Sequence, residues 1–502
     1  MKKSFAVVIT VLAAVTSALP QSLTIDSFTK AKAALDRSVA AYGGRDALNS
    51  ISNVSIKIAG DSVHRNQSRR PGDFDRTPYS AEIVIDLKNA RAMQTQKGHY
   101  PGGFNWHQGL VVDAGNRTSF DLIRKTSNPP GSITPAAFKA NTRWLPQLVL
   151  LNVIERAETL RYLGAAHYDK RAHEVIDYVT QDGARLALYI DQKTGYLSKF
   201  ETLITDRFAG ESVLETRFTE QRKVGNYIVP ARRVNALNGD VTNDFGFSDV
   251  AFNSELRPET FKLPEGLRPV TFPAPTPVTK HADKIYTTSA GGYNVLFVDF
   301  SDHIFVMEAP GNDRVSIQAI EQIKKTIPNK PIKYAAISHH HDDHAGGIRT
   351  YMAEGATLII TPGEQEFLTK VSKVRFVAEP DSLTRAPREP KFEPVQNGKR
   401  VLTDGTITVE IYDIGSGPHA EGMLVAYFPQ HKMIYQGDLL NRPPNGDYPI
   451  ANDTSAHFLE WVDGKKLAVE MTIPVHGTPT TIAEFRKAVA ELKSKNTSQT
   501  LQ

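Results

Sequence analysis

The feature that most constrains this chain is the segment 338–347, which reads Ser-His-His-His-Asp-Asp-His-Ala-Gly-Gly. Its imidazole and carboxylate side chains follow directly on the apolar segment 332–337, which has the length and composition of a buried strand. In open α/β sheets, functional sites form at the carboxyl ends of strands. Strands near 294–300 and 303–308, a helix near 314–326 and the strand 332–337 indicate a layered α/β domain. The His-rich segment therefore lies where a site is expected.

The residue types in this run favour metal binding. The chain has no cysteine, so a metal ion must be held by nitrogen and oxygen atoms. His339 and His341 are two residues apart and can face the same way in an extended loop. Asp343 and His344 lie where the loop should turn into a helix, and they can serve a second ion.

The other members of the run are not expected to bind metal. His340 and Asp342 should point away from the metal ions, and Gly346-Gly347 should let the following helix pack closely. A solvated histidine tract that binds metal loosely is the alternative. Such a tract does not predict further isolated ligands downstream.

Three isolated candidate ligands do follow, each beside a predicted strand or turn. His419 precedes the apolar run 423–428, Asp438 ends the strand-like segment 433–437, and His476 follows Ile-Pro-Val and precedes a glycine. Two divalent ions held close together need about six or seven such groups. The run and the three later residues together supply that number.

This His-x-His-x-Asp-His run, followed in order by His, Asp and His, resembles the metallo-β-lactamase superfamily over about residues 280–495. The resemblance implies two β-sheets packed between helices, as expected for the C-terminal part of an α+β protein. It implies two zinc ions, with iron or manganese as alternatives. One ion would be bound by His339, His341 and His419, the other by Asp343, His344 and His476, and Asp438 would bridge the two.

The implied activity is hydrolysis. Two bound ions lower the pKa of a shared water and generate a hydroxide nucleophile without an activated serine or cysteine. Asp343 is the candidate catalytic residue, placed to orient this water and accept its proton. A single-iron sulfur oxygenase, which uses a similar loop with one ion, remains an alternative.

The substrate is narrowed by comparison among the branches of this superfamily. A bridging carboxylate at Asp438 resembles lactonases and thioester hydrolases, whereas β-lactamases usually lack it, so β-lactamase activity is an alternative only. The 26 residues after His476 are too few for the helical domain of glutathione thioester hydrolases. We expect an ester, lactone or amide bond of a small molecule.

A proline-rich segment divides the chain. Five prolines between residues 264 and 277 disfavour both helix and central strand, which predicts a linker over 266–279. The preceding part, 21–265, shows a helical segment at 27–50, short alternating runs such as 54–58 and 197–203, and helical spacing at 134–163. These patterns predict an antiparallel sheet domain with a few helices.

Local features of this N-terminal part resemble the periplasmic lipoprotein-carrier fold, a curved sheet with an apolar concave face. They are the turn in Tyr-Ile-Asp-Gln-Lys-Thr-Gly-Tyr at 189–196, the segment 224–230, and Phe-Lys-Leu-Pro at 261–264. The resemblance implies binding of a lipid-like molecule or contact with a membrane surface. A purely structural or dimerisation domain is the alternative.

The N-terminal residues predict where the protein is located. Residues 1–20 carry two lysines, an apolar run and then small residues, the layout of a secretory signal peptide cleaved after Ala18. We therefore expect an exported protein, periplasmic or extracellular.

The charge of the chain gives no indication of nucleic-acid binding. The net charge of +4 arises from 59 basic and 55 acidic residues, and the chain has no tract in which basic and aromatic residues alternate, so we expect no nucleic-acid partner.

Overall fold

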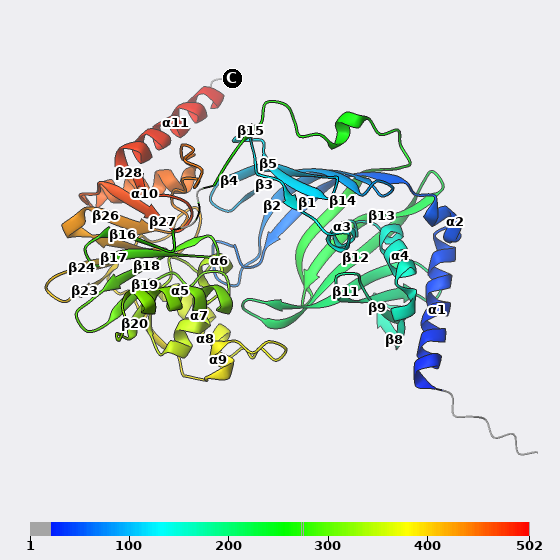
Figure 1. Cartoon of the computed structure of the whole chain (residues 1–502), viewed down its shortest axis with the longest axis horizontal. Helices are drawn as coiled ribbons and strands as arrows, with labels where there is room; N and C mark the ends of the chain where they lie inside the picture. The colour runs from blue at the N-terminus through cyan, green and yellow to red at the C-terminus, as the bar shows by residue number, and fades with distance from the viewer. Residues whose placement is uncertain (1–21, 273, 275, 501–502) are drawn as a thin grey trace, which may run out of the picture.

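The computed structural model describes residues 22–272, 274 and 276–500. The predicted signal peptide lies outside this part of the chain. Figure 1 shows a large curved sheet, built from the N-terminal half, beside a C-terminal domain in which helices flank β-sheets. Within the described residues, no helix combines the length and the apolar character needed to cross a membrane.

The N-terminal sheet contains fifteen strands in the described residues and is antiparallel apart from the two-residue pairing of β15 with β6. Its order is β15-β6-β5-β4-β3-β2-β1-β14-β13-β12-β11-β10-β9-β8, with β7 on β5. The strands are β1 (Asn53–His64), β2 (Asp75–Asp86), β3 (Arg91–Tyr100), β4 (Phe104–Asp113), β5 (Asn116–Asp121), β6 (Thr126–Ser127), β7 (Gly131–Ser132), β8 (Arg161–Tyr168), β9 (Arg171–Val179), β10 (Arg185–Asp191), β11 (Leu197–Asp206), β12 (Gly210–Val224), β13 (Tyr227–Leu237), β14 (Asp240–Phe252) and β15 (Arg268–Pro269).

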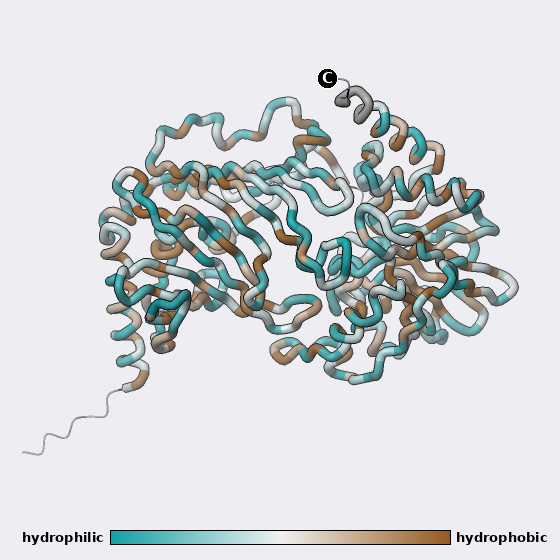
Figure 2. Tube along the Cα trace, turned by 180° about the vertical axis from the view of Figure 1, so that it is seen from behind, coloured by the Kyte–Doolittle hydropathy of each residue, from teal (hydrophilic) through white to brown (hydrophobic). Residues whose placement is uncertain are grey.

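One face of this sheet is covered by helices. The helices are α1 (Leu23–Ala41), α2 (Gly44–Asn49), α3 (Pro135–Asn141) and α4 (Pro146–Glu155). The alternation that predicted the first strand is confirmed, because Val54, Ile56 and Ile58 are buried in one core cluster with residues of α3 and α4. Figure 2 shows the matching alternation of hydrophobic and hydrophilic segments along the strands.

The C-terminal domain has two sheets. The first has the order β16-β17-β18-β19-β20-β21-β22 and the second β23-β24-β25-β26-β27-β28. Their bounds are β16 (Val278–Ala282), β17 (Ile285–Ala290), β18 (Tyr293–Asp299), β19 (Ile304–Met307), β20 (Ile332–Ala336), β21 (Thr357–Ile360), β22 (Lys391–Pro394), β23 (Lys399–Thr403), β24 (Thr408–Asp413), β25 (Leu424–Phe428), β26 (Met433–Gln436), β27 (Met471–Pro474) and β28 (Thr480–Thr481).

Three core layers account for the order helix, sheet, sheet, helix. One apolar cluster joins the first sheet to α5 (Asp313–Thr326), α7 (Ile348–Glu354), α8 (Gln365–Ser372) and α9 (Ser382–Arg385). A second cluster lies between the two sheets. A third joins the second sheet to α10 (Asp453–Gly464) and α11 (Ile482–Thr500). The predicted α+β fold class, a β-rich domain followed by a sandwich of sheets between helices, is confirmed.

The last helix of this half begins with a capping pair. Thr481 and Glu484 form a reciprocal cap at the start of α11. Phe485 and Val489 on the same helix are buried against the second sheet. The division of the chain at residues 266–279 stays a prediction; within that stretch β15 pairs with the N-terminal sheet, and β16 of the next sheet begins at Val278.

Candidate metal centre

The seven predicted ligands come from four places in the C-terminal domain. Residues 339–344 connect β20 to the short helix α6 (Asp342–Ala345), and His419, Asp438 and His476 follow β24, β26 and β27. Parallel pairing places β20 beside β19 and β27 beside β26, so these chain ends meet at one edge of the sandwich. Separate strands therefore deliver side chains to one small volume.

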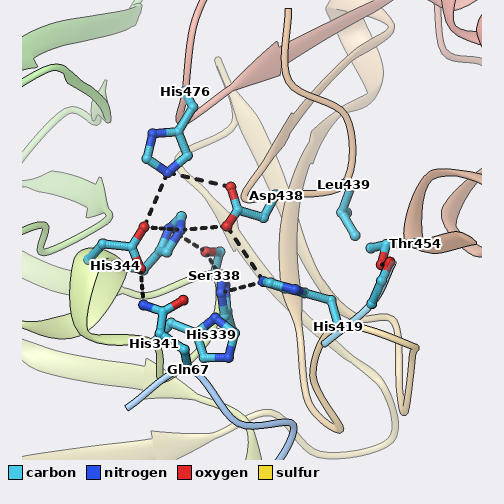
Figure 3. Close-up of polar contacts among 12 residues, drawn as sticks. Gln67, Ser338, His339, His341, His344, His419, Asp438, Leu439, Thr454 and His476 are labelled. Atoms are coloured by element: carbon cyan, nitrogen blue, oxygen red, sulfur yellow. Dashed lines mark hydrogen bonds and ion pairs between the residues drawn. The ribbon is translucent and has the colours of Figure 1, made fainter. Parts of the chain in front are cut away.

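The structure brings all seven residues together in two groups. The first group is His339, His341 and His419, and the second is Asp343, His344, Asp438 and His476. Within each group, one ligand atom per residue lies within 4.8 Å of the others. Figure 3 shows the side chains of His344, His419, Asp438 and His476 converging, with His339 beneath them.

The spacing of the ligand atoms fits bound metal ions. Nε2 of His339 and Nε2 of His419 are 3.1 Å apart, and two nitrogens on one tetrahedral zinc ion at about 2.0–2.1 Å lie about 3.3 Å apart. Asp438 Oδ2 is 3.2 Å from His344 Nε2 and 3.5 Å from His419 Nε2, so one oxygen approaches a member of each group. The ligand roles stay predictions, and this geometry is compatible with Asp438 as the bridge.

In each of these buried histidines, one ring nitrogen contacts a group that is not a predicted metal ligand. His344 Nδ1 lies 3.2 Å from Glu308 Oε2 and His339 Nδ1 lies 3.0 Å from Ser338 Oγ. His341 Nε2 donates to the Ser68 carbonyl at 2.9 Å, which leaves its Nδ1 buried without a partner. A buried, unpartnered nitrogen facing the site is the signature of a missing ligand bond, so the residues present fit a metal ion.

The charges of the two groups differ. Burial and the neighbouring imidazoles hold the pKa of His339 well below its usual value. Burial also acts to lower the pKa of His344, but Asp343, Asp438 and Glu308 raise it well above the usual value. Burial would raise the pKa of Asp438, yet His344 and His476 hold it well below the usual range. The second group therefore favours positive charge, whether a proton or a metal ion.

Backbone conformation contributes to the placement of two carboxylates. Asp438 has φ +55° and Glu308 has φ +95°, both in the region that side chains other than glycine rarely adopt. Such conformations persist where surrounding contacts over-determine them, and they concentrate at functional sites. Here both turns aim an acidic side chain at His344.

Comparison with known proteins agrees with this geometry. The sequence model of the family described as "Metallo-beta-lactamase superfamily" matches residues 313–482. The C-terminal half is a metallo-β-lactamase superfamily domain. The matched residues lie outside the N-terminal sheet domain. Fold and ligand clusters together suggest a metal-dependent hydrolase with a binuclear site.

Solved structures with similarity to the chain include several of this type. The DIM-1 metallo-beta-lactamase is 19% identical with a TM-score of 0.33, and the match covers 43% of this chain and 97% of that one. The mono-zinc form of FIM-1 from Pseudomonas aeruginosa is 21% identical with a TM-score of 0.33, and the match covers 45% of this chain and 98% of that one. The stereoselective inverting sec-alkylsulfatase Pisa1 from Pseudomonas sp. is 15% identical with a TM-score of 0.31, and the match covers 42% of this chain and 40% of that one. Similarity at these levels says nothing of substrate.

The remaining members of the ligand run lie as predicted, outside the metal groups. His340 Nε2 donates to the Ser68 carbonyl, and Asp342 accepts from Gln67. The close packing expected of Gly346-Gly347 is also present: a Cβ on Gly346 would lie 2.2 Å from the Gly311 carbonyl oxygen.

Two residues that contact the predicted ligands were not among the predicted site residues. Glu308 is buried beside His344, and the only sequence hint is an acidic residue directly after the buried strand β19. Asn441 donates to Asp438 Oδ1 at 3.0 Å. Arg442, in the turn after Asp438, is half-buried and forms an ion pair with Glu484 at 3.0 Å.

Proposed function

We propose that this protein is an exported, zinc-dependent hydrolase that cleaves an ester, lactone or amide bond of a small molecule. The observation that carries the proposal is the pair of neighbouring ligand groups, with Asp438 Oδ2 lying 3.2 Å from His344 of one group and 3.5 Å from His419 of the other. Two zinc ions held there would supply Lewis acidity and a water of lowered pKa. Export is supported by the signal-peptide layout of residues 1–20.

Exposure of the ligands indicates how substrate would arrive. His339, His341 and His344 are fully buried, whereas the side chains of His476 and Asp343 are 31% and 24% exposed. The open side of the site is therefore the side of His476 and Asp343. Asp343 Oδ1 accepts from Gln67, and its Oδ2 lies 3.4 Å from both His344 and His476. We assign to this carboxylate the orientation of a water and the acceptance of its proton.

A cleft beside the site supports a substrate with an apolar part. It has a volume of about 880 Å³ and is walled by both halves of the molecule. Its walls include Phe104, whose ring packs edge-on against His419, and Asn441, which donates to Asp438. Ile123 and Ile450, two of its apolar wall residues, are 45% and 49% exposed. Apolar side chains left open beside a polar site are typical of small-molecule pockets.

The proposal is tested by a substrate panel with wild type and His341→Ala. The panel contains lactones, aryl esters, aryl amides, thioesters, a chromogenic cephalosporin and phosphodiesters. We expect hydrolysis of an ester, lactone or amide by wild type and loss of about 10³-fold or more in the variant, which lacks one predicted ligand. If every activity survives the substitution, the proposed mechanism is wrong.

For the N-terminal domain, one observation favours lipid-like ligand binding. A cavity of about 260 Å³ is lined mainly by apolar side chains of β2, β3 and β4 together with Trp144. The guanidinium of Arg233 lies 4.5 Å from the Trp144 ring centroid, and burial lowers its pKa to about 10. Among the described residues, no carboxylate lies within ion-pair distance of Arg233, and its Nε has no partner. An amphiphile with an anionic head would supply the missing charge.

This second function is tested with the full chain and a fluorescent fatty acid. Arg233→Met should weaken binding about tenfold or more, whereas Arg232→Met should not. Arg232 is the matched control, because it is the neighbouring arginine on β13 and is exposed and paired with Asp244. Absence of binding by wild type, or equal binding by the Arg233 variant, would exclude this role.

A further inference from the structure

Two turns of the N-terminal sheet lie directly against the ligands of the metal centre. One is the β1–β2 connection at residues 65–74, and the other is the β3–β4 turn at 101–103. Ser68 in the first turn and Pro101 in the second each present a backbone carbonyl to a predicted ligand. Figure 3 shows Gln67 of the first turn beneath the converging ligands.

The two carbonyls determine which ring nitrogens of His341 and His419 are left free as ligand atoms. A carbonyl oxygen only accepts, so a histidine bonded to it must carry its proton on that nitrogen. His341 donates through Nε2 to Ser68 at 2.9 Å, which leaves Nδ1 as the free ligand atom. His419 donates through Nδ1 to Pro101 at 3.1 Å, which leaves Nε2 free. Two of the three imidazoles of the first group are thus oriented by the N-terminal domain.

Gln67 performs the same task for the second group. Its amide nitrogen donates to Asp342 Oδ1 at 2.7 Å and to Asp343 Oδ1 at 2.8 Å. Both carboxylates are thereby satisfied on one side, and Asp343 turns its Oδ2 toward His344 and His476. The Gln67 side-chain amide thus binds both a predicted metal ligand, Asp343, and the residue before it.

The non-ligand members of the run secure the first turn. His340 donates to the same Ser68 carbonyl as His341, and the Asp342 backbone N–H donates to the Asn66 carbonyl. Arg69 donates to the Gly417 carbonyl, two residues before His419. The two members of the run that are not predicted ligands, His340 and Asp342, therefore both bind the N-terminal domain.

The second turn approaches as closely as backbone allows. Gly102 has φ +92°, and a Cβ there would lie 2.8 Å from His419 Cα and 2.7 Å from Thr454 Oγ1. Only a residue without a side chain lets the Pro101 carbonyl reach His419.

We propose that the N-terminal domain completes the metal centre, with Gln67 as a positioning residue for Asp343 and the Ser68 and Pro101 carbonyls as positioning groups for His341 and His419. The inference rests on the metal site of the proposed function and is independent of the substrate. Outer partners of this kind typically change metal affinity 10–100-fold.

The first test compares Gln67→Ala with Arg70→Ala, measuring zinc affinity by competition with a chromogenic chelator. Arg70 lies on the same turn but forms an exposed ion pair with Glu421, so it controls for the docking of the turn. We expect about tenfold weaker zinc binding, and a changed visible spectrum of the cobalt form, for the Gln67 variant alone. The metal-free forms of the two variants should melt within about 2 °C of each other.

The second test compares Gly102→Ala with Gly115→Ala. Both glycines have positive φ, +92° and +75°, but nothing lies within 4 Å of a Cβ on Gly115. The backbone strain is thus matched, and only Gly102→Ala displaces the turn from His419. It should weaken zinc binding about tenfold relative to the control.

The outcomes separate this inference from the proposed function. If wild type holds two zinc ions and both test variants bind them as tightly as their controls, the N-terminal domain does not complete the site. If wild type holds no metal ion, the metal site itself is refuted and this inference with it.

Discussion

At the scale of single residues, the site depends on what lies behind each ligand. His344 is held between Asp438 on the metal side and Glu308 on the other. Glu308 also accepts from the Ser338 backbone N–H at 2.9 Å, so its carboxylate is shared between the strand end and the imidazole. This contact predicts that a residue outside the ligand set controls metal affinity.

We expect Glu308→Gln to weaken zinc binding about tenfold. The amide oxygen can still accept from Ser338, but the amide nitrogen cannot accept from His344 Nδ1–H. Chelator competition measures the change, with Glu354→Gln, which breaks only a surface pair with Lys324, as the control. Equal affinities in the two variants would contradict the assigned role.

A second residue-scale prediction concerns pH. Burial raises the pKa of Glu364 to about 8, although its carboxylate accepts from the Thr361 backbone N–H. The folded state then holds a proton on Glu364 that the unfolded state releases near pH 4.5, so stability is lost as pH rises from about 4.5 to 8. The loss is on the order of 4 kcal/mol.

Glu364→Gln removes this titration while keeping the shape and the acceptor. Unfolding by denaturant at pH 5 and pH 8 should show a smaller loss of stability in the variant than in wild type. Glu366→Gln, an exposed position on the following helix, should behave as wild type. The same pH dependence in all three proteins would show that Glu364 is ionised when folded.

At the scale of elements, the sequence predicted most of the units that carry the site. The strand 332–337, the apolar run 423–428 and the strand-like segment 433–437 were all recognisable, because an apolar run of strand length is a local signal. The strands β3 and β4 were not predicted. Their sequences alternate weakly, since much of β3 is only half-buried, and their pairing is fixed by neighbours in the sheet.

Close packing of elements around the ligand run gives a further prediction. A Cβ on Gly347 would lie 2.0 Å from Ser316 Oγ, on the facing helix α5. Gly347→Ala should therefore destabilise the fold by about 1–3 kcal/mol. Gly363→Ala, where nothing lies within 4 Å of the added Cβ, should change the free energy of unfolding by less than about 1 kcal/mol in the same denaturation experiment.

At the scale of the whole molecule, the two halves share one site. The ligand set could be predicted because its members recur in order after strands, which is a pattern within one domain. The contribution of Gln67 could not, because 276 residues separate it from Asp343 and no local pattern marks the tip of a turn as an outer partner. Contacts between domains depend on tertiary geometry, and only the structure supplies it.

The central claim, a two-zinc hydrolytic site, is tested most directly by metal analysis of the purified protein combined with an oxygen-uptake assay. About two zinc ions per chain, removable by chelator with loss of hydrolysis and restored by adding zinc, is the predicted result. One iron ion per chain with oxygen uptake would contradict it.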